Sequence, residues 1–94
     1  MSADKTRQAV CSRVCQLLGE TRIKRELSMT TLAEKTGLSQ QAISYMEREM
    51  RIPNLDTLLR ISISLKVNLG DIVNQAECEV SQKSSKARDV VAEI

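Results

Sequence analysis

The sequence predicts a small all-α domain built from five helices. Its 94 residues are enough for one compact domain and little more. The hydrophobic content is 41%, yet Tyr45 is the only aromatic residue, so the core must be aliphatic, as suits packed helices. Apolar residues recur at helical spacing along much of the chain, and Pro53 is its single proline.

The first helix is predicted over about residues 6–26. No proline interrupts this stretch, although Gly19 weakens the helical pattern and leaves open whether the helix is continuous. The apolar residues that recur at roughly helical spacing are Val10, Val14, Leu17, Leu18 and Ile23.

Two short helices joined by a tight turn are predicted next. Ser28 is a favourable N-cap for a helix over about 29–36, and Gly37 supplies the left-handed conformation that ends it. Ser39 caps the following helix, which we expect to run to about Arg48. The residues expected to face the core are Leu32, Ala33, Ile43 and Met46.

The second of these helices keeps amides and hydroxyls on its outer face. Gln40, Gln41, Ser44 and Tyr45 stay free when Ile43 turns inward. Such a face is suited to a polar surface, and a base-pair edge is the candidate.

The fourth helix is predicted over about 55–66, after a loop at 49–53. Pro53 prevents a helix from continuing through it, and Asn54 caps the next one. Ile61 and Ile63 are expected to widen its apolar face. The residues predicted to point inward are Leu55, Leu58, Leu59, Ser62 and Leu65.

A fifth helix is predicted over about 69–76, burying Ile72 and Val73 after a capping-box-like start at Asn68 and Asp71. The sequence becomes polar after it and apolar again at its end. We therefore assign the domain to residues 6–76 and a C-terminal tail to 77–94. The tail could be disordered, an added helix, a strand that pairs with a partner, or part of a dimer.

Composition and charge exclude several classes of function. Three cysteines without a CxxC pair, and no histidine, predict no metal site, and nothing in the sequence calls for a cofactor. Cys11 and Cys15 lie one helical turn apart. We expect them to serve as small apolar packing residues, and the alternative is a redox role. The chain has no nucleophile elbow, phosphate loop or clustered carboxylates, so we expect no enzyme.

The expected location follows from what the sequence lacks and from where its charges lie. No stretch approaches the length of a membrane span, and no signal-peptide core is present, which favours the cytoplasm. The net charge is only +2, but up to Pro53 nine Lys or Arg stand against six Asp or Glu. The basic half therefore contains the two short helices.

Residues from about 17 to 73 resemble the helix-turn-helix domain of the phage Cro and repressor proteins, the Xre family. This resemblance implies a compact five-helix lambda-repressor-like fold and a DNA-binding transcriptional regulator associated with the nucleoid. Two positions differ: Met29 stands where members usually have Gln, and Glu49 where many have Gly. The matching residues are Leu27-Ser28, Leu32 through Ser39, Ile43-Ser44, Glu47-Arg48, Pro53-Asn54-Leu55, Thr57-Leu58-Leu59, Leu65, Val67 and Ile72.

The resemblance implies a role for each exposed polar residue around the third helix. By position, Gln40, Gln41, Ser44 and Tyr45 face bases in the major groove of double-stranded DNA. Arg22 and Glu47 match a pair that forms a salt bridge near the DNA in relatives. The alternative for each is an ordinary solvated surface. The candidates for phosphate contacts are Arg22, Ser28, Thr30, Lys35, Arg48, Arg51 and Asn54.

Self-association is expected because one small domain makes few DNA contacts. Ile63 stands where relatives commonly have a polar residue, and with Leu69 it predicts a homodimer contact. The alternative is a single exposed apolar residue. A homodimer on a two-fold operator, repressing by blocking polymerase, is the leading hypothesis.

The competing hypothesis is a protein-interaction module of the antitoxin type. In that case the tail at 77–94 binds a partner protein, while the helix-turn-helix regulates its own operon.

Overall fold

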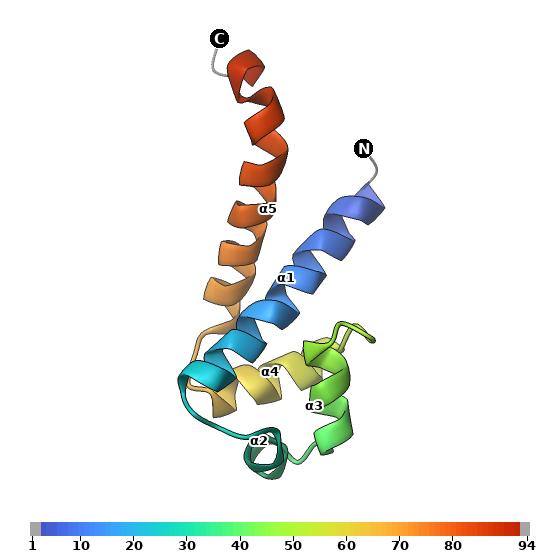
Figure 1. Cartoon of the computed structure of the whole chain (residues 1–94), viewed down its shortest axis with the longest axis vertical. Coiled ribbons are helices and arrows are strands. Elements are labelled where there is room, and N and C mark those ends of the chain that lie inside the picture. Colours follow the sequence, from blue (N-terminus) through green and yellow to red (C-terminus); the bar gives the residue numbers. More distant parts are fainter. Residues whose placement is uncertain (1–2, 93–94) are drawn as a thin grey trace.

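The computed structural model describes the backbone of residues 3–92 and the side chains of residues 4–81. In this range all regular structure is helical, and the predicted all-α fold with five helices is confirmed. The long helices α1 and α5 pack against each other, and the three short helices gather at one end of the molecule (Figure 1). The helices are α1 (Ala3–Lys24), α2 (Met29–Thr36), α3 (Gln40–Glu47), α4 (Leu55–Ser64) and α5 (Leu69–Ala92).

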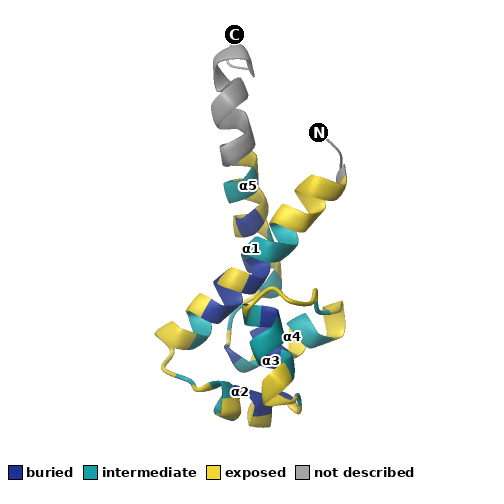
Figure 2. Ribbon diagram, turned by 45° about the vertical axis from the view of Figure 1, so that its right-hand side comes forward, coloured by how far each residue is buried: buried dark blue, intermediate teal, exposed yellow. Residues whose placement is uncertain are grey.

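The core is aliphatic and receives side chains from every helix. Leu18 of α1, Leu32 of α2 and Ile43 of α3 are fully buried where these helices meet. Ile61 of α4 is fully buried with them, and Ala76 of α5 lies against the same cluster. In Figure 2 the N-terminal end of α1 is exposed, and buried segments of α1 appear from its middle onward, toward the short helices. Tyr45 is absent from the core, as expected for a domain filled by aliphatic side chains.

Side-chain caps start three helices at the predicted residues. Ser28 Oγ accepts a hydrogen bond from the Thr31 amide, and Asn54 Oδ1 accepts one from the Thr57 amide. Ser39 starts α3 in the same way. Each cap satisfies an amide that has no partner within its own helix. The ends of these short helices are therefore fixed locally by the sequence.

Gly37 ends α2 in the predicted left-handed conformation. Its φ is 76°, and its amide donates to the carbonyl of Ala33 over 2.9 Å. A side chain at this position would strain the backbone, because L-residues other than Asn and Asp rarely adopt positive φ. The turn between α2 and α3 therefore depends on this glycine.

The predicted inward face of α4 was wrong at two positions. Leu55 is 64% exposed and Leu59 is 41% exposed, whereas Ile61 is fully buried. The helix carries more aliphatic residues than one face can bury, and its docking selects the face that contains Leu58 and Leu65. Periodicity alone could not choose between the two faces.

The long helices differ from their predicted bounds: α1 starts three residues earlier and ends two residues earlier than expected, and α5 continues past its predicted end. α1 begins at Ala3, ends at Lys24 and passes through Gly19 without interruption. α5 continues through the residues assigned to a tail and ends at Ala92, since no Gly or Pro stops it. The predicted protein-binding role of the tail falls largely on side chains outside the described residues. None of the helices described is long and apolar enough to cross a membrane.

We predict that Gly37→Ala destabilises the protein by about 1–2 kcal/mol, the cost of a left-handed L-residue. The added Cβ would lie 3.4 Å from Arg60 Nη1, an ordinary van der Waals distance, so the cost is conformational rather than steric. Urea denaturation measures the free energy of unfolding. Gly37→Asn is the control, because Asn tolerates positive φ and should lose clearly less. Equal losses in the two variants would contradict this account.

Candidate nucleic-acid interface

The outer face of α3 presents the four predicted base-reading residues together. Gln40 and Gln41 are exposed, and Ser44 and Tyr45 are partly exposed. Ile43 and Met46 on the opposite face are 0% and 2% exposed and hold the helix against the core. The α-helical period places the four polar residues on one side, so α3 is a two-faced element with a polar outer surface.

The outer face carries hydrogen bonds that a ligand could replace. Thr30 Oγ1 donates to Gln40 Oε1 over 3.2 Å, and Gln41 Nε2 donates to the Tyr45 hydroxyl over 2.6 Å. All four groups lie at the surface, where water exchanges readily with such partners. The two glutamine amides are therefore held in place without being committed to the interior.

A groove of about 360 Å³ runs beside the outer face of α3, between this helix and the start of α4. The Arg51 guanidinium lies 5.4 Å from the centre of the Tyr45 ring, in a cation–π contact. Asn54 lines the same groove at the N-terminus of α4. The groove therefore places a cation and a helix N-terminus, both favourable for an anion, next to Gln41.

The other predicted phosphate residues are spread around this centre. Ser28 caps α2, and Thr30 reaches Gln40 from the first turn of that helix. Lys35 and Arg48 are exposed, and neither forms an ion pair with another described residue. The structure thus brings Arg51 and Asn54 to the groove and leaves Lys35 as an isolated surface charge.

A nearly buried ion pair fixes the C-terminal end of α3. Arg22 Nε lies 2.6 Å from Glu47 Oε2, and Arg22 Nη2 lies 3.0 Å from Glu47 Oε1. The two side chains are only 12% and 11% exposed. Arg22 Nη1 also donates to the carbonyl of Leu27, just before α2. The hydrogen bonds to Glu47 raise the pKa of Arg22 and keep its charge inside the fold.

Gly19 permits the close approach of Glu47 to α1. A Cβ at position 19 would lie 3.2 Å from Glu47 Cγ, tighter than an ordinary contact. Gly19 is unfavourable for the helix itself, but its missing side chain leaves room for Glu47. Through Glu47, the end of α3 is anchored to α1. Arg22 is a positioning residue in this geometry, and its direct phosphate contact stays a prediction.

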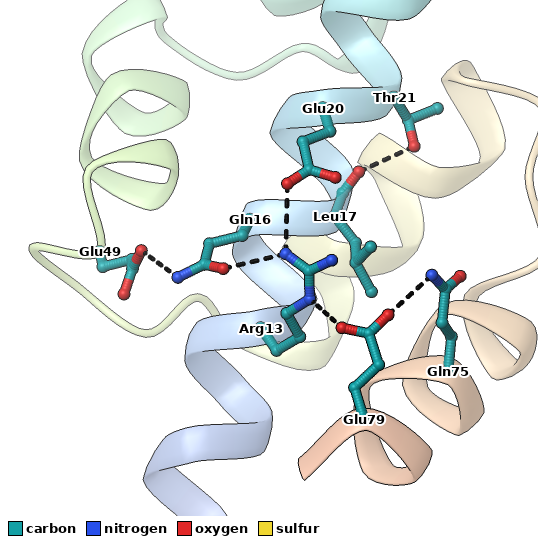
Figure 3. Close-up of polar contacts among 8 residues, drawn as sticks. All are labelled: Arg13, Gln16, Leu17, Glu20, Thr21, Glu49, Gln75 and Glu79. Atoms are coloured by element: carbon teal, nitrogen blue, oxygen red, sulfur yellow. Dashed lines mark hydrogen bonds and ion pairs between the residues drawn. The ribbon is translucent and has the colours of Figure 1, made fainter. Parts of the chain in front are cut away.

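A second polar network, which sequence reasoning missed, joins α1, α5 and the turn after α3 (Figure 3). Arg13 Nε donates to Glu79 Oε1 of α5 over 2.5 Å, and Arg13 Nη1 donates to Gln16 Oε1 over 3.0 Å. Gln16 Nε2 then donates to Glu49 Oε2 over 2.9 Å. No periodicity or motif signals contacts between residues so distant in sequence.

Glu49 follows α3 in a left-handed conformation, with φ 60°. The left-handed conformation explains why many family members have glycine at this position, because glycine reaches positive φ without strain. Its carboxylate is turned toward α1 by the bond from Gln16 (Figure 3). The acidic side chain is therefore held at the edge of the interface by a contact within the protein.

The remaining predicted residues lie away from the outer face of α3. Ile63 is 69% exposed, while Leu69 is partly buried against the core.

Burial raises the pKa of the Cys15 thiol to about 11, which fits an unreactive packing residue. The described residues contain no group of three or more His, Cys, Asp or Glu that could hold a metal ion.

We predict that Arg22→Met destabilises the protein by about 3 kcal/mol, because it leaves the Glu47 carboxylate unpaired in a nearly buried site. The double variant Arg22→Met, Glu47→Leu should lose much less, since neither charge remains. Chemical denaturation of the single and double variants measures the coupling. Arg7→Met removes an exposed arginine 3.9 Å from Asp4 and should have little effect. Additive losses in the double variant would contradict a coupled pair.

Comparison with known proteins finds relatives of this chain. Two curated relatives, both named uncharacterized HTH-type transcriptional regulators of Mycobacterium tuberculosis (strains CDC 1551 / Oshkosh and ATCC 25618 / H37Rv), are 32% identical over 65 residues. The match covers 69% of this chain and 46% of each relative, so the chain spans less than half the length of these relatives. No solved structure matches it significantly.

A family model described as helix-turn-helix matches residues 18–72. This match runs from the second half of α1 to the first turn of α5 and includes α2, the Gly37 turn and α3. It covers more than half of the chain. The chain therefore belongs to the Xre-type helix-turn-helix family.

Proposed function

We propose that this protein is a sequence-specific DNA-binding transcriptional regulator that reads the major groove with α3. The observation that carries the proposal is the two-faced α3. Ile43 and the Arg22–Glu47 pair fix its inner side, while Gln40 and Gln41 stand exposed on its outer side. An anchored helix with exposed side-chain amides matches the requirement for reading base-pair edges.

Each outer residue has a chemical counterpart in the groove. A glutamine amide donates and accepts at once, which matches the N6 and N7 edge of adenine. Ser44 is short enough to take either a base or a phosphate, and the Tyr45 ring can contact a thymine methyl group. In the absence of DNA, Gln40 accepts a hydrogen bond from Thr30 and Gln41 donates one to Tyr45, and base contacts would replace these exposed bonds.

Phosphate contacts would come from the elements around α3. The N-termini of α2 and α4, at Ser28 and Asn54, supply backbone amides and a partial positive charge. Arg51 stands beside Asn54 on the groove, and Arg48 follows α3 directly. These contacts would fix the register of the protein on the duplex, and the glutamines would supply the preference for sequence.

The regulator would act as a homodimer on a two-fold operator. The eight residues of α3 reach few base pairs, so one copy offers limited specificity. Two copies related by a two-fold axis would read half-sites one helical turn apart. Repression by blocking polymerase is the simplest outcome of such binding, and it would take place at the nucleoid. The printed names of the two relatives agree with regulation of transcription.

We expect Gln40→Ala with Gln41→Ala to abolish preference among DNA sequences while leaving weak binding that falls steeply with salt. The phosphate contacts survive in this double variant, but the base contacts do not. Selection of bound fragments from genomic DNA, followed by affinity measurements at two salt concentrations, tests this. Gln8→Ala changes an exposed glutamine at the far end of α1 and serves as the control. Unchanged sequence preference in the double variant would rule out base reading by these residues.

Glu49→Gln is expected to strengthen binding to all DNA sequences by a similar factor. The substitution removes a negative charge next to α3 and keeps an oxygen that can accept the bond from Gln16. The gain should be largest at low salt, where screening is weakest. Glu77→Gln, an exposed change on α5, is the control. A gain limited to one DNA sequence would instead place Glu49 in contact with bases.

A further inference from the structure

Glu49 places a negative charge between two cations that are candidates for phosphate contacts. Arg48 directly precedes it, and Arg51 follows it at the groove beside α3. The Glu49 side chain is exposed, so its charge is not buried. A freely moving carboxylate at this place would repel the phosphate backbone or neutralise the neighbouring guanidinium groups. The direction in which this carboxylate points therefore affects DNA binding.

The backbone around Glu49 is fixed by the end of α3. The Glu49 amide donates to the carbonyl of Met46 over 3.0 Å, and the Met50 amide donates to the carbonyl of Tyr45 over 2.9 Å. This pair of bonds is typical of a helix that ends in a left-handed residue, which here is Glu49 with φ 60°. The direction in which the side chain leaves the backbone is thereby set, and only its side-chain torsions remain free.

The Glu49 carboxylate is directed toward α1 by Gln16. Gln16 Nε2 donates to Glu49 Oε2 over 2.9 Å (Figure 3). The pKa of the Cys15 thiol, next to Gln16 on α1, is raised chiefly by burial and to a smaller extent by the negative charges of Cys11 and Glu49. Both features place the Glu49 carboxylate beside α1.

Arg13 decides which end of the Gln16 amide meets Glu49. Arg13 Nη1 donates to Gln16 Oε1 over 3.0 Å, so the amide oxygen faces a cation and Nε2 faces the carboxylate. A guanidinium group has only donors and a carboxylate has only acceptors, so the reverse orientation of the amide would lose both bonds. Arg13 therefore fixes the polarity of the contact that Gln16 makes with Glu49.

Arg13 is held in turn by carboxylates on two helices. Its Nε donates to Glu79 Oε1 of α5 over 2.5 Å, and its Nη1 lies 3.2 Å from Glu20 Oε2 of α1. Glu79 also accepts a bond from Gln75 Nε2 over 2.9 Å, which orients the carboxylate on α5. A continuous set of side-chain contacts therefore connects α5 to the turn after α3 (Figure 3).

We propose that Gln16, oriented by Arg13 and Glu79, is a positioning residue of the DNA interface. Gln16 holds the Glu49 carboxylate on α1, so that the arginines on either side of Glu49 remain available for phosphates. The proposal rests on the proposed DNA-binding function, and it adds α5 to the elements on which affinity depends. When these contacts are broken, Glu49 turns toward the DNA backbone or pairs with a neighbouring arginine, and binding to every DNA sequence weakens.

The expected effect of releasing Glu49 corresponds to the loss of about one phosphate contact. The logarithm of the binding constant falls with the logarithm of the salt concentration by about 0.9 for each phosphate contacted. Release of Glu49 should therefore weaken binding by about three- to tenfold at 0.1 M salt and should reduce the salt slope by about 1. Preference among sequences should not change, because the outer face of α3 is not altered.

Affinity measurements on Gln16→Ala test the proposal, with one selected duplex and one unrelated duplex of equal length. We expect Gln16→Ala to weaken binding to both duplexes alike and to flatten the salt dependence. The same substitution should have no effect in a Glu49→Gly chain, because no carboxylate remains to be held, and glycine fits the positive φ. Gln8→Ala, a change of an exposed glutamine on the same helix, is the matched control. Equal losses with and without Glu49 would overturn the proposal.

The link to α5 is tested by a substitution whose charge change favours DNA binding. Glu79→Gln removes a negative charge, which by itself would strengthen binding. The proposal predicts the opposite, a loss of about twofold, because Arg13 loses a partly exposed ion pair that fixes it. Glu77→Gln makes the same charge change at an exposed position of α5 and should not weaken binding. Equal gains in the two variants would overturn the role of α5.

NMR of the full chain without DNA tests the contact itself. Glu49→Gly should shift the side-chain amide resonances of Gln16 and leave those of Gln8 unchanged. Unshifted Gln16 resonances would overturn the proposal. A chain that selects specific DNA but is insensitive to Gln16→Ala would overturn the positioning role alone. A chain that binds no DNA would contradict the proposed function, and the positioning role with it.

Discussion

The ion pair between Arg22 and Glu47 is the contact on which the arrangement of the short helices depends. An isolated helix of eight residues is unstable in water, so α3 exists only because the rest of the chain holds it. Burial of Ile43 and Met46 supplies most of that stabilisation but fixes little of the rotation of the helix. A bidentate pair at one end of α3 fixes the rotation, because guanidinium and carboxylate meet in one plane.

The same pair also explains why α1 contains a glycine. The side chain of Glu47 passes close to α1 on its way to Arg22, and a Cβ at position 19 would lie 3.2 Å from Glu47 Cγ. Arg22 adds a bond to the carbonyl of Leu27 and so ties the approach to α2 to the end of α3. The Arg22 side chain thus joins the segment before α2 and the end of α3 to α1. Because contacts on the inner side of α3 fix its orientation, the residues of its outer face can be polar.

Local signals in the sequence predicted the caps and the turn of the helix-turn-helix motif. They did not predict the contacts between elements that are distant in sequence. The caps at Ser28, Ser39 and Asn54 and the turn at Gly37 are decided by residues within a few positions, so sequence alone placed them. The network through Arg13 depends on α5 lying beside α1, which no local pattern contains. The resemblance to the family predicted the Arg22–Glu47 pair. The contact between Gly19 and Glu47 is visible only in the three-dimensional structure.

The error at α4 shows how a crowded apolar helix can serve two surfaces. Leu55 and Leu59 share the period of the residues that do enter the core, so periodicity alone assigns them to it. Ser62 is 1% exposed, although it is polar, and its hydroxyl is satisfied by the carbonyl of Leu59. α4 thus buries a serine beside Ile61 and Leu65, while two of its leucines stay at the surface. Leaving Leu55 and Leu59 at the surface forgoes the hydrophobic stabilisation that their burial would supply. The side of α4 that enters the core is therefore decided by its packing against the other helices, which the period of its own apolar residues does not show.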